Sequence, residues 1–443
     1  MSNYIIKAKY VLKNNLDIIK DAEIEITNKI ITYLGKERSG KKEEFIYLTY
    51  PYGLVMPAFV NGHTHLPETL IRGLCDDEDL HTWLYDHVWQ VEPSMTDEHA
   101  KVGAQLGIAE MIRSGTVAFI DQYFYAHQIA KAVAESGVKA FLAPSIFEGN
   151  PETKSIERAF QQNKKVFDTW HGHDNRIFIG FGPHAHYSVP EESFKEIIAE
   201  TKQRKTKIHT HVSETQKEVK EAKEKYNLTP VAYLDKLGAL EHVLAAHCIH
   251  LEEQDIALLH SNNVSILSNP QSNLKIGAGI APIPYYLEKE LNIILGTDGS
   301  ASNNNLDIME EARLLSLLHK GLHNDPKLLP VKQIIPLFTS NASKEFPNNS
   351  YAGILGEGKP ADLVVYNMNS VNNTPIIHPL SNMFFSSNAT DIVLTMADGK
   401  ILYEKIDEKE SFKTINIEEV KKKAQQAIEE MMSKADYTAN SIL

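Results

Sequence analysis

Short apolar runs alternate with amphipathic segments through the middle of the chain, from about residue 58 to residue 350. The apolar runs have the length of buried strands, and the longer segments between them repeat their apolar residues at helical spacing. Such an alternation predicts an α/β fold with a parallel sheet or a (β/α) barrel. The expected strands are 117–120, 177–181, 243–246, 264–267 and 293–295, and the expected helices are 98–113, 126–136, 153–169, 190–204, 214–226 and 307–320.

The two ends of the chain have a β-rich pattern instead. Residues 21–26 alternate isoleucine with glutamate, and residues 392–403 form a hairpin pattern that turns at Asp398-Gly399. Because the ends of a chain that holds an inserted domain commonly lie close together, we expect both ends to build one small β-sandwich beside a distorted (β/α)8 barrel. The expected domains are a sandwich of 1–57 with 351–410, a barrel of 58–350, and a C-terminal helical extension of 411–443.

Charge and cysteine content exclude several classes of protein. The chain has 45 Lys and Arg residues against 58 Asp and Glu residues, a formal net charge of −13, which disfavours binding to nucleic acid. Its two cysteines cannot form a disulfide framework or a cysteine-rich zinc module. With no signal peptide and no apolar run of about 18 residues, we expect a cytoplasmic protein without a membrane partner. The sequence leaves a homo-oligomer open.

Two histidines follow the apolar run 54–60. In a strand, alternate side chains point to the same side, so His63 and His65 can approach a single ion. Alone, this pair could equally be the polar end of a strand with two incidental histidines.

Three more predicted strands end in the same kind of side chain, namely His211, His247 and Asp298. Barrel enzymes gather their functional groups at the C-terminal ends of the strands. Imidazole and carboxylate ligands without cysteine suit a catalytic Zn²⁺ or Fe²⁺ with one position open for water. His209 points to the same face as His211 in a regular strand, so it competes with His211 as a ligand.

These motifs carry a family resemblance. The segment Pro57-x-Phe59-Val60-Asn61-x-His63-Thr64-His65, together with His211-x-x-Glu214, His247 and Asp298, resembles the amidohydrolase superfamily, and within it the branch of metal-dependent deaminases and triazine-type hydrolases. The resemblance covers nearly the whole chain, including Gly358-Lys359-Pro360-Ala361-Asp362-Leu363, where the family's barrel returns to its sandwich. It implies that His63, His65, His211 and Asp298 bind the metal and that His247 contacts the metal-bound water.

The resemblance also implies the number of ions and the acid–base groups. No lysine stands where two-metal members carry a carbamylated lysine, so one Zn²⁺ per subunit is favoured, with Fe²⁺ as the other option. Glu214 matches the deaminase acid/base, although an acid at a helix N-terminus is the alternative. Asp298 would accept a proton from the water. The family pattern favours His211 over His209, which we expect to pack one layer deeper.

Three further positions match substrate contacts of this branch. His184 matches a histidine that contacts a purine, Glu92 matches a carboxylate that binds ribose hydroxyls, and Ser302 matches a polar contact to the base; Glu214 would also touch the base. The implied substrate is a small adenosine-type nucleoside: 5′-methylthioadenosine, S-adenosylhomocysteine, 5′-deoxyadenosine or adenosine. Lys139 and Arg158 are the nearest candidates for gripping a homocysteine carboxylate, and that contact stays open.

Two alternatives remain. One is another aminohydrolase or chlorohydrolase of the same superfamily that acts on guanine, cytosine or a triazine. The other is a non-catalytic scaffold, which would be expected to have lost ligands that this chain retains.

Overall fold

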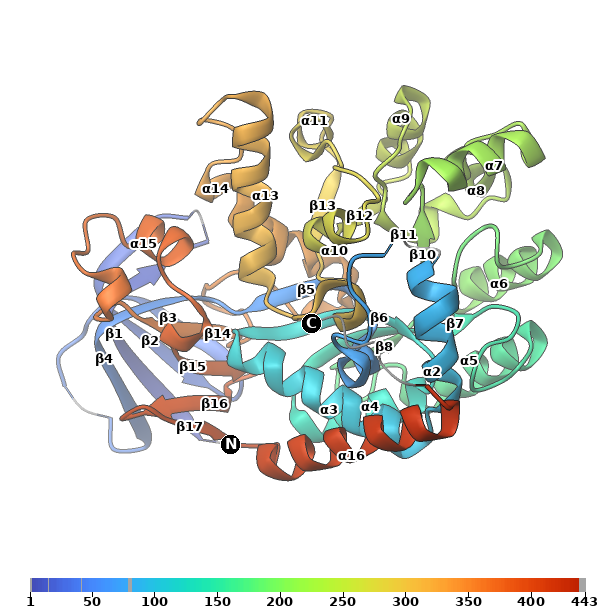
Figure 1. Cartoon of the computed structure of the whole chain (residues 1–443). Helices are drawn as coiled ribbons and strands as arrows, with labels where there is room; N and C mark the ends of the chain where they lie inside the picture. Colours follow the sequence, from blue (N-terminus) through green and yellow to red (C-terminus); the bar gives the residue numbers. More distant parts are fainter. Residues whose placement is uncertain (1, 15, 41, 79–81, 438–443) are drawn as a thin grey trace.

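The computed structural model describes residues 2–14, 16–40, 42–78 and 82–437. Parallel strands and their covering helices occupy one part of the molecule, and a large sheet occupies the other (Figure 1). The described residues include no helix long and apolar enough to cross a bilayer.

The middle of the chain forms two four-membered sets of parallel strands. The first set pairs in the order β5 (Phe59–Thr64), β6 (Thr116–Tyr123), β7 (Lys139–Ile146) and β8 (Ile177–Ile179). The second set pairs in the order β10 (Ile208–Val212), β11 (Val243–His247), β12 (Ser265–Ser268) and β13 (Asn292–Leu295). Nearly every residue of these strands is buried, as expected for parallel strands covered by helices.

Helices follow the strands along the chain, as the alternating pattern predicted. The six predicted helices are found as α3 (Asp97–Arg113), α4 (Ala126–Ser136), α5 (Ile156–Trp170), α6 (Glu191–Arg204), α7 (Gln216–Tyr226) and α13 (Ile308–His323). Shorter helices complete this part: α2 (Trp89–Val91), α8 (Pro230–Lys236), α9 (Glu253–Ser261), α10 (Pro270–Lys275), α11 (Ile283–Glu288), α12 (Ser300–Asn303) and α14 (Val331–Ile334).

Hydrogen bonds connect the two sets of strands at both of their edges. At one edge the Phe181 N–H donates to the Lys207 carbonyl over 3.0 Å, and the His209 N–H donates to the Phe181 carbonyl over 2.9 Å. At the other edge the Asp298 N–H donates to the His63 carbonyl over 2.9 Å. Strand β8 ends at Ile179, before the predicted end at residue 181, and at Gly180 the two edges lie so close that an added Cβ would stand 2.5 Å from the Lys207 carbonyl oxygen. The chain then resumes pairing with β7 at β9 (Gly182–Pro183).

The β-rich ends of the chain combine in a single eight-stranded sheet. Strand β4 reaches its neighbour β14 from the other end of the chain, with Val55 opposite Val365. All neighbours are antiparallel except β1 and β4. The order is β17 (Lys409–Phe412), β16 (Lys400–Ile406), β15 (Ile392–Ala397), β14 (Leu363–Asn367), β4 (Phe45–Pro57), β1 (Asn3–Leu12), β2 (Ile18–Thr27) and β3 (Ile30–Lys36).

Two α-helices follow β14 on the way to the C-terminus. Helix α15 (Pro379–Phe385) precedes the predicted hairpin at Asp398-Gly399, which joins β15 to β16. Helix α16 (Ile417–Ala435) lies beside α3 (Figure 1), with His99 Nε2 3.2 Å from a Glu430 carboxylate oxygen. It falls within the predicted extension 411–443, of which residues 438–443 lie outside the described residues.

A buried lysine ties the two parts of the molecule together. Lys139, at the start of β7, is fully buried and places its Nζ 2.5 Å from Asp362 Oδ2, 2.8 Å from Asp398 Oδ1 and 2.5 Å from the Ser350 carbonyl oxygen. Its charge is therefore neutralised between the parallel strands and the eight-stranded sheet.

Candidate active site

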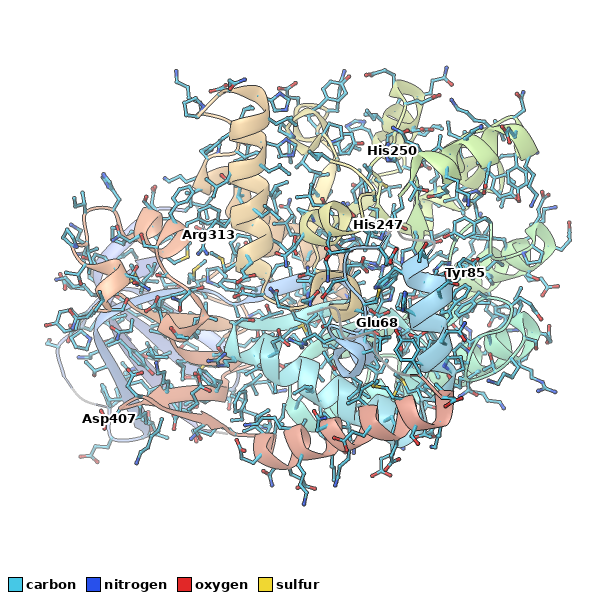
Figure 2. The ribbon with its side chains drawn as sticks, viewed as in Figure 1. Glu68, Tyr85, His247, His250, Arg313 and Asp407 are labelled. Atoms are coloured by element: carbon cyan, nitrogen blue, oxygen red, sulfur yellow. The ribbon has the colours of Figure 1, made fainter. Side chains whose placement is uncertain are left out.

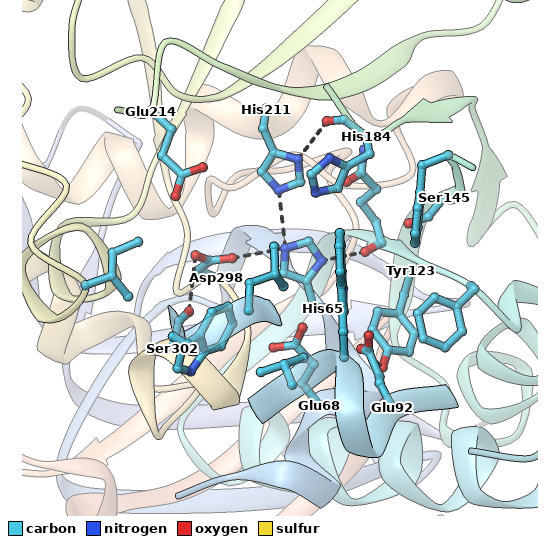
Figure 3. A pocket seen from close by; sticks show the side chains of 18 of the residues that line it. His65, Glu68, Glu92, Tyr123, Ser145, His184, His211, Glu214, Asp298 and Ser302 are labelled. Atoms are coloured by element: carbon cyan, nitrogen blue, oxygen red, sulfur yellow. Dashed lines mark hydrogen bonds and ion pairs between the residues drawn. The ribbon is translucent and has the colours of Figure 1, made fainter. Parts of the chain in front are cut away.

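The predicted site residues line one pocket at the C-terminal ends of the parallel strands (Figure 3). Parallel strands end on the same side of the sheet, so side chains far apart in sequence meet there. In Figure 2, Glu68 and His247 lie toward the middle of the molecule, whereas Asp407 lies at its edge. The predicted residues on the pocket wall are His65, Glu92, His184, His211, Glu214, His247, Asp298 and Ser302, and His63 lies directly behind them.

The first group of possible ligands contains His63, His65 and Asp298, which bring one ligand atom each to within 4.8 Å of one another. Asp298 Oδ1 lies 3.2 Å from His63 Nε2 and 3.1 Å from His65 Nε2. The other ring nitrogen of His65 lies 2.6 Å from the Gln122 carbonyl oxygen, which fixes the ring orientation.

The second group joins His211 and His247 to His63, again within 4.8 Å. His211 Nε2 lies 3.4 Å from His65 Nε2, so both nitrogens face the same point. Each ring is oriented from behind: His211 Nδ1 lies 2.8 Å from the His184 carbonyl oxygen, and His247 Nδ1 lies 2.8 Å from Asn273 Oδ1. These backbone and amide contacts leave the Nε2 atoms for a ligand.

His209 does not join either group. Its Nε2 lies 2.8 Å from His63 Nδ1, in a fully buried position below the pocket. The structure therefore agrees with the expectation that His209 packs one layer deeper, and it adds a contact that orients the His63 ring.

The protonation states of these groups favour the binding of a cation. Burial lowers the pKa of His63 to about 4 and that of His211 well below its usual value, so both imidazoles are neutral. Burial alone would raise the pKa of Asp298. The contacts with His63 and His65 lower the pKa by more than burial raises it, so the net pKa lies well below its usual value. Burial also opposes the charged form of His65, yet Asp298 and Glu68 raise its pKa to about 10. His65 is therefore protonated in the absence of a metal, and a bound cation could take the place of that proton.

The donor set fits a metal ion. His63 Nε2 is buried and lacks a well-aligned hydrogen-bond partner. Neutral imidazoles and an ionised carboxylate, with no cysteine, form the ligand chemistry of catalytic Zn²⁺ or Fe²⁺ sites. The described residues can thus hold one ion where the two groups share His63.

Two of the site residues have a left-handed backbone. His247 has φ +68° and Asp298 has φ +64°, a conformation that costs non-glycine residues free energy. Both stand where a strand turns into a loop, and the strained turn directs their side chains at the pocket.

Glu214 lies outside the helix that follows it. Thr215 is the N-cap of α7, and Glu218 is the acid of its first turn. The Glu218 carboxylate accepts a hydrogen bond from the Glu214 N–H over 2.7 Å. The Glu214 side chain lies beside His247, with Oε1 3.8 Å from His247 Nε2. Burial raises the pKa of Glu214 to about 7. These observations favour an acid–base role over the helix-end alternative.

Ser302 contacts Asp298 rather than standing free. Its Oγ donates to Asp298 Oδ2 over 3.2 Å, and Ser272 Oγ donates to the same oxygen over 2.7 Å. The two hydroxyls orient the carboxylate so that Oδ1 faces the histidines. Ser302 also lines the pocket, so the predicted contact with a base stays open.

Glu92 and His184 lie on the side of the pocket away from Asp298 (Figure 3). Glu92 is buried, and its carboxylate accepts a hydrogen bond from the Tyr123 hydroxyl. Burial raises the pKa of Glu92 to about 7 and lowers that of His184 to about 3. The His184 ring lies 4.6 Å from the His211 ring, between centroids, and can therefore meet a substrate held at the cluster.

Sequence reasoning missed Glu68, a buried carboxylate on the pocket wall below His65. Burial raises its pKa to about 8, helped by the negative charge of Glu92 and opposed by His65. Its spacing of three residues after His65 is the one signal that could have indicated it. The aromatic residues Trp83 and Trp89 were missed as well.

Known proteins resemble this chain over most of its length. Residues 54–402 match the model of the Amidohydrolase family. The chain is 40% identical to a 5-methylthioadenosine/S-adenosylhomocysteine deaminase of Dictyoglomus turgidum, covering 88% of this chain and 91% of the relative. It is 37% identical to a 5'-deoxyadenosine deaminase of Methanobrevibacter smithii, covering 96% and 94%.

Two solved structures superpose on nearly the whole chain. A zinc-bound adenosine deaminase of Xanthomonas campestris superposes with a TM-score of 0.91 at 28% identity, over 98% of this chain and 99% of that one. The zinc complex of an atrazine chlorohydrolase of Arthrobacter aurescens superposes with a TM-score of 0.87 at 21% identity, over 96% and 100%, and this likeness extends to the fold alone.

Proposed function

The chain belongs to the amidohydrolase family, and from that premise we propose that it is a metal-dependent deaminase of an adenosine-type nucleoside. The reaction would convert the nucleoside and water into the inosine analogue and ammonia. One observation carries the proposal: His65, His211 and Asp298 meet Glu214 in a pocket that also holds the buried Glu92.

His63, His65, His211 and Asp298 would hold one ion, Zn²⁺ or Fe²⁺, with His247 beside the open position. When bound, such an ion lowers the pKa of water and so supplies a nucleophile near neutral pH. The support is the two triplets whose ligand atoms lie within 4.8 Å of one another, His63 with His65 and Asp298, and His63 with His211 and His247. A zinc-bound adenosine deaminase of similar fold supports it too.

Two carboxyl groups would move the protons. Asp298 would accept a proton from the attacking water, since it is ionised and its Oδ1 faces the histidine cluster. Glu214, with a pKa raised to about 7, would donate a proton to the ring nitrogen next to the amino-bearing carbon. The proton held by Asp298 would then pass to the departing amino group, which leaves as ammonia. The new hydroxyl group on that carbon would return a proton to Glu214 as it becomes the carbonyl of the inosine analogue, and His247 would stabilise the charge that develops beside it.

The remaining wall of the pocket would bind the nucleoside. Glu92 would accept hydrogen bonds from the ribose 2′ and 3′ hydroxyls, and His184 and Glu214 would contact the purine. The Ser302 hydroxyl already donates a hydrogen bond to Asp298. Ser302 would therefore contact the base with the hydrogen-bonding capacity that this bond leaves free.

We further propose that the two sets of parallel strands close into a distorted (β/α)8 barrel over 58–350, supported by the hydrogen bonds at both of their edges. Residues 1–57 and 351–410 would form the accompanying sandwich domain, and 411–443 a helical extension.

The principal alternative is an aminohydrolase or chlorohydrolase acting on guanine, cytosine or a triazine. It would leave the buried Glu92 carboxylate without a ribose to bind. A non-catalytic scaffold would not account for the left-handed backbone of His247 and Asp298 or for the orientation of the histidine rings toward one point.

Release of ammonia, together with release of chloride from the triazine, tests the proposal. The metal-loaded protein is assayed with adenosine, 5′-deoxyadenosine, 5′-methylthioadenosine and S-adenosylhomocysteine, and in parallel with guanine, cytosine and a chlorinated triazine. We expect turnover of nucleosides and loss of it in Glu214→Gln. Turnover of only a free base or a triazine would establish the alternative, and no turnover of any compound by protein with full metal content would favour the scaffold.

A further inference from the structure

The pocket wall next to Glu92 is aromatic and aliphatic. Trp89 stands three residues before Glu92 on one helical stretch, and residues at this spacing lie on the same face of a helix. The Trp89 and Phe147 rings are nearly parallel, at 8°, with centroids 6.2 Å apart. The apolar residues of this wall are Trp83, Leu84, Val88, Trp89, Phe124 and Phe147.

The described residues that line the pocket include no lysine or arginine. Its acidic groups are Glu68, Glu92, Glu214 and Asp298. A carboxylate that enters beside Glu92 would therefore meet aromatic rings and other carboxyl groups, without a lysine or arginine side chain to replace its hydration.

Neither Lys139 nor Arg158 can supply that cation. Lys139 is at the start of β7, whereas Ser145 lines the pocket near the strand's end, roughly 20 Å away at about 3.3 Å per residue. Lys139 is also fully buried between Asp362 and Asp398. Arg158 is exposed on α5 and does not line the pocket.

We infer that the pocket selects nucleosides whose 5′ substituent is small, uncharged and apolar, such as hydrogen or methylthio, and discriminates against S-adenosylhomocysteine. This inference rests on the proposed function, in which Glu92 holds the ribose diol. The 5′ carbon is attached next to that diol, so its substituent reaches Trp89 and Phe147. The ammonium group of an amino-acid tail could pair with an acid of the pocket, but the tail's carboxylate would lose water without gaining a partner.

Relative kcat/KM values for the four adenosine derivatives test this selection. We expect 5′-deoxyadenosine and 5′-methylthioadenosine to exceed S-adenosylhomocysteine by at least about tenfold, since an unpaired buried charge lowers binding strongly. A ratio below threefold, or a preference for S-adenosylhomocysteine, would overturn the inference while leaving the deaminase intact. Turnover of no nucleoside would overturn the proposed function and this inference with it.

A gain of function provides the second arm. Ser145 lies on the same side of the pocket as Glu92 and Tyr123 (Figure 3). Ser145→Arg should raise the kcat/KM ratio of S-adenosylhomocysteine to 5′-deoxyadenosine at least about fivefold by pairing the tail's carboxylate. Ser145→Gln, which adds length without charge, is the matched control and should leave the ratio near that of the unaltered protein. Equal ratios in the two variants would contradict the inference.

Discussion

The backbone N–H of Asp298 donates directly to the carbonyl oxygen of His63 over 2.9 Å, so two predicted metal ligands, one in the first parallel strand (β5) and one just after the last (β13), share a hydrogen bond. Two glycines permit this approach. A Cβ on Gly296 would stand 2.5 Å from the His63 nitrogen, and a Cβ on Gly62 would stand 2.6 Å from Ile294 Cγ2. The relative position of the carboxylate and the imidazoles is therefore set by the backbone.

Removing the metal should abolish activity and lower the melting temperature. A chelator takes away the ion that satisfies His63, His65, His211 and Asp298, and any ligand bound only by the folded state stabilises it. His63→Ala should lose both metal and turnover, measured by elemental analysis and ammonia release. His173→Ala, at a partly exposed histidine outside the cluster, is the control. Full metal content in His63→Ala would contradict the ligand assignment.

Glu214→Gln should lower kcat by about 100-fold or more while metal content and melting temperature stay unchanged. The amide is isosteric but cannot transfer a proton, and acid–base catalysis typically contributes about 10²–10⁴-fold. Glu221→Gln, at an exposed position on α7, should be neutral. A kcat within threefold of the unaltered protein would show that Glu214 is not the acid.

Glu92→Gln should weaken recognition of ribose without changing metal content. The unaltered protein should prefer adenosine over 2′,3′-dideoxyadenosine by at least about tenfold in kcat/KM, because the buried carboxylate loses its hydroxyl partners with the latter. The variant should reduce that preference to about threefold or less. An unchanged preference would place the ribose elsewhere in the pocket.

Lys139→Met should reduce the free energy of unfolding by roughly 3–5 kcal/mol, because it leaves the buried Asp362 and the half-buried Asp398 without their cation. The ratio of kcat/KM values between substrates should not change, since Lys139 does not line the pocket. Denaturant titration measures the first and steady-state kinetics the second. Lys101→Met removes a partly exposed pair with Glu135 and should cost about 1 kcal/mol or less.

Glu311→Gln should change how stability depends on pH. Burial raises the pKa of Glu311 from 4.5 to about 8, although hydrogen bonds from Gln271 N and Asn303 Nδ2 oppose the shift. The folded state thus keeps a proton that the unfolded chain releases, and the associated stability is present in full below about pH 4.5 and is lost as the pH rises toward 8.

The melting temperature of Glu311→Gln relative to the unaltered protein should therefore increase between pH 4.5 and 8. Glu310→Gln, at an exposed neighbour on the same helix, is the control. A constant difference across this range would show that Glu311 is ionised in the folded protein.

Periodicity and strand-end position made much of this structure predictable. The six helices and the histidine cluster follow from patterns that repeat every two or every 3.6 residues. Glu68 and Trp89 could not be predicted in this way, because they lie in short helical turns whose side chains are directed by packing rather than by a period. The sequence offers Lys139 as a candidate substrate contact, because its sequence neighbourhood does not reveal that it stands at the buried start of β7, against Asp362.

The contact between Asp298 and His63 also has a consequence for synthesis of the protein. A growing chain presents His63 and His65 early, whereas Asp298 emerges only after both sets of parallel strands have been made. The four residues that would hold the proposed ion are therefore brought together only once β13 has docked against β5, so the complete set of donors is a property of the assembled strands and of no shorter segment.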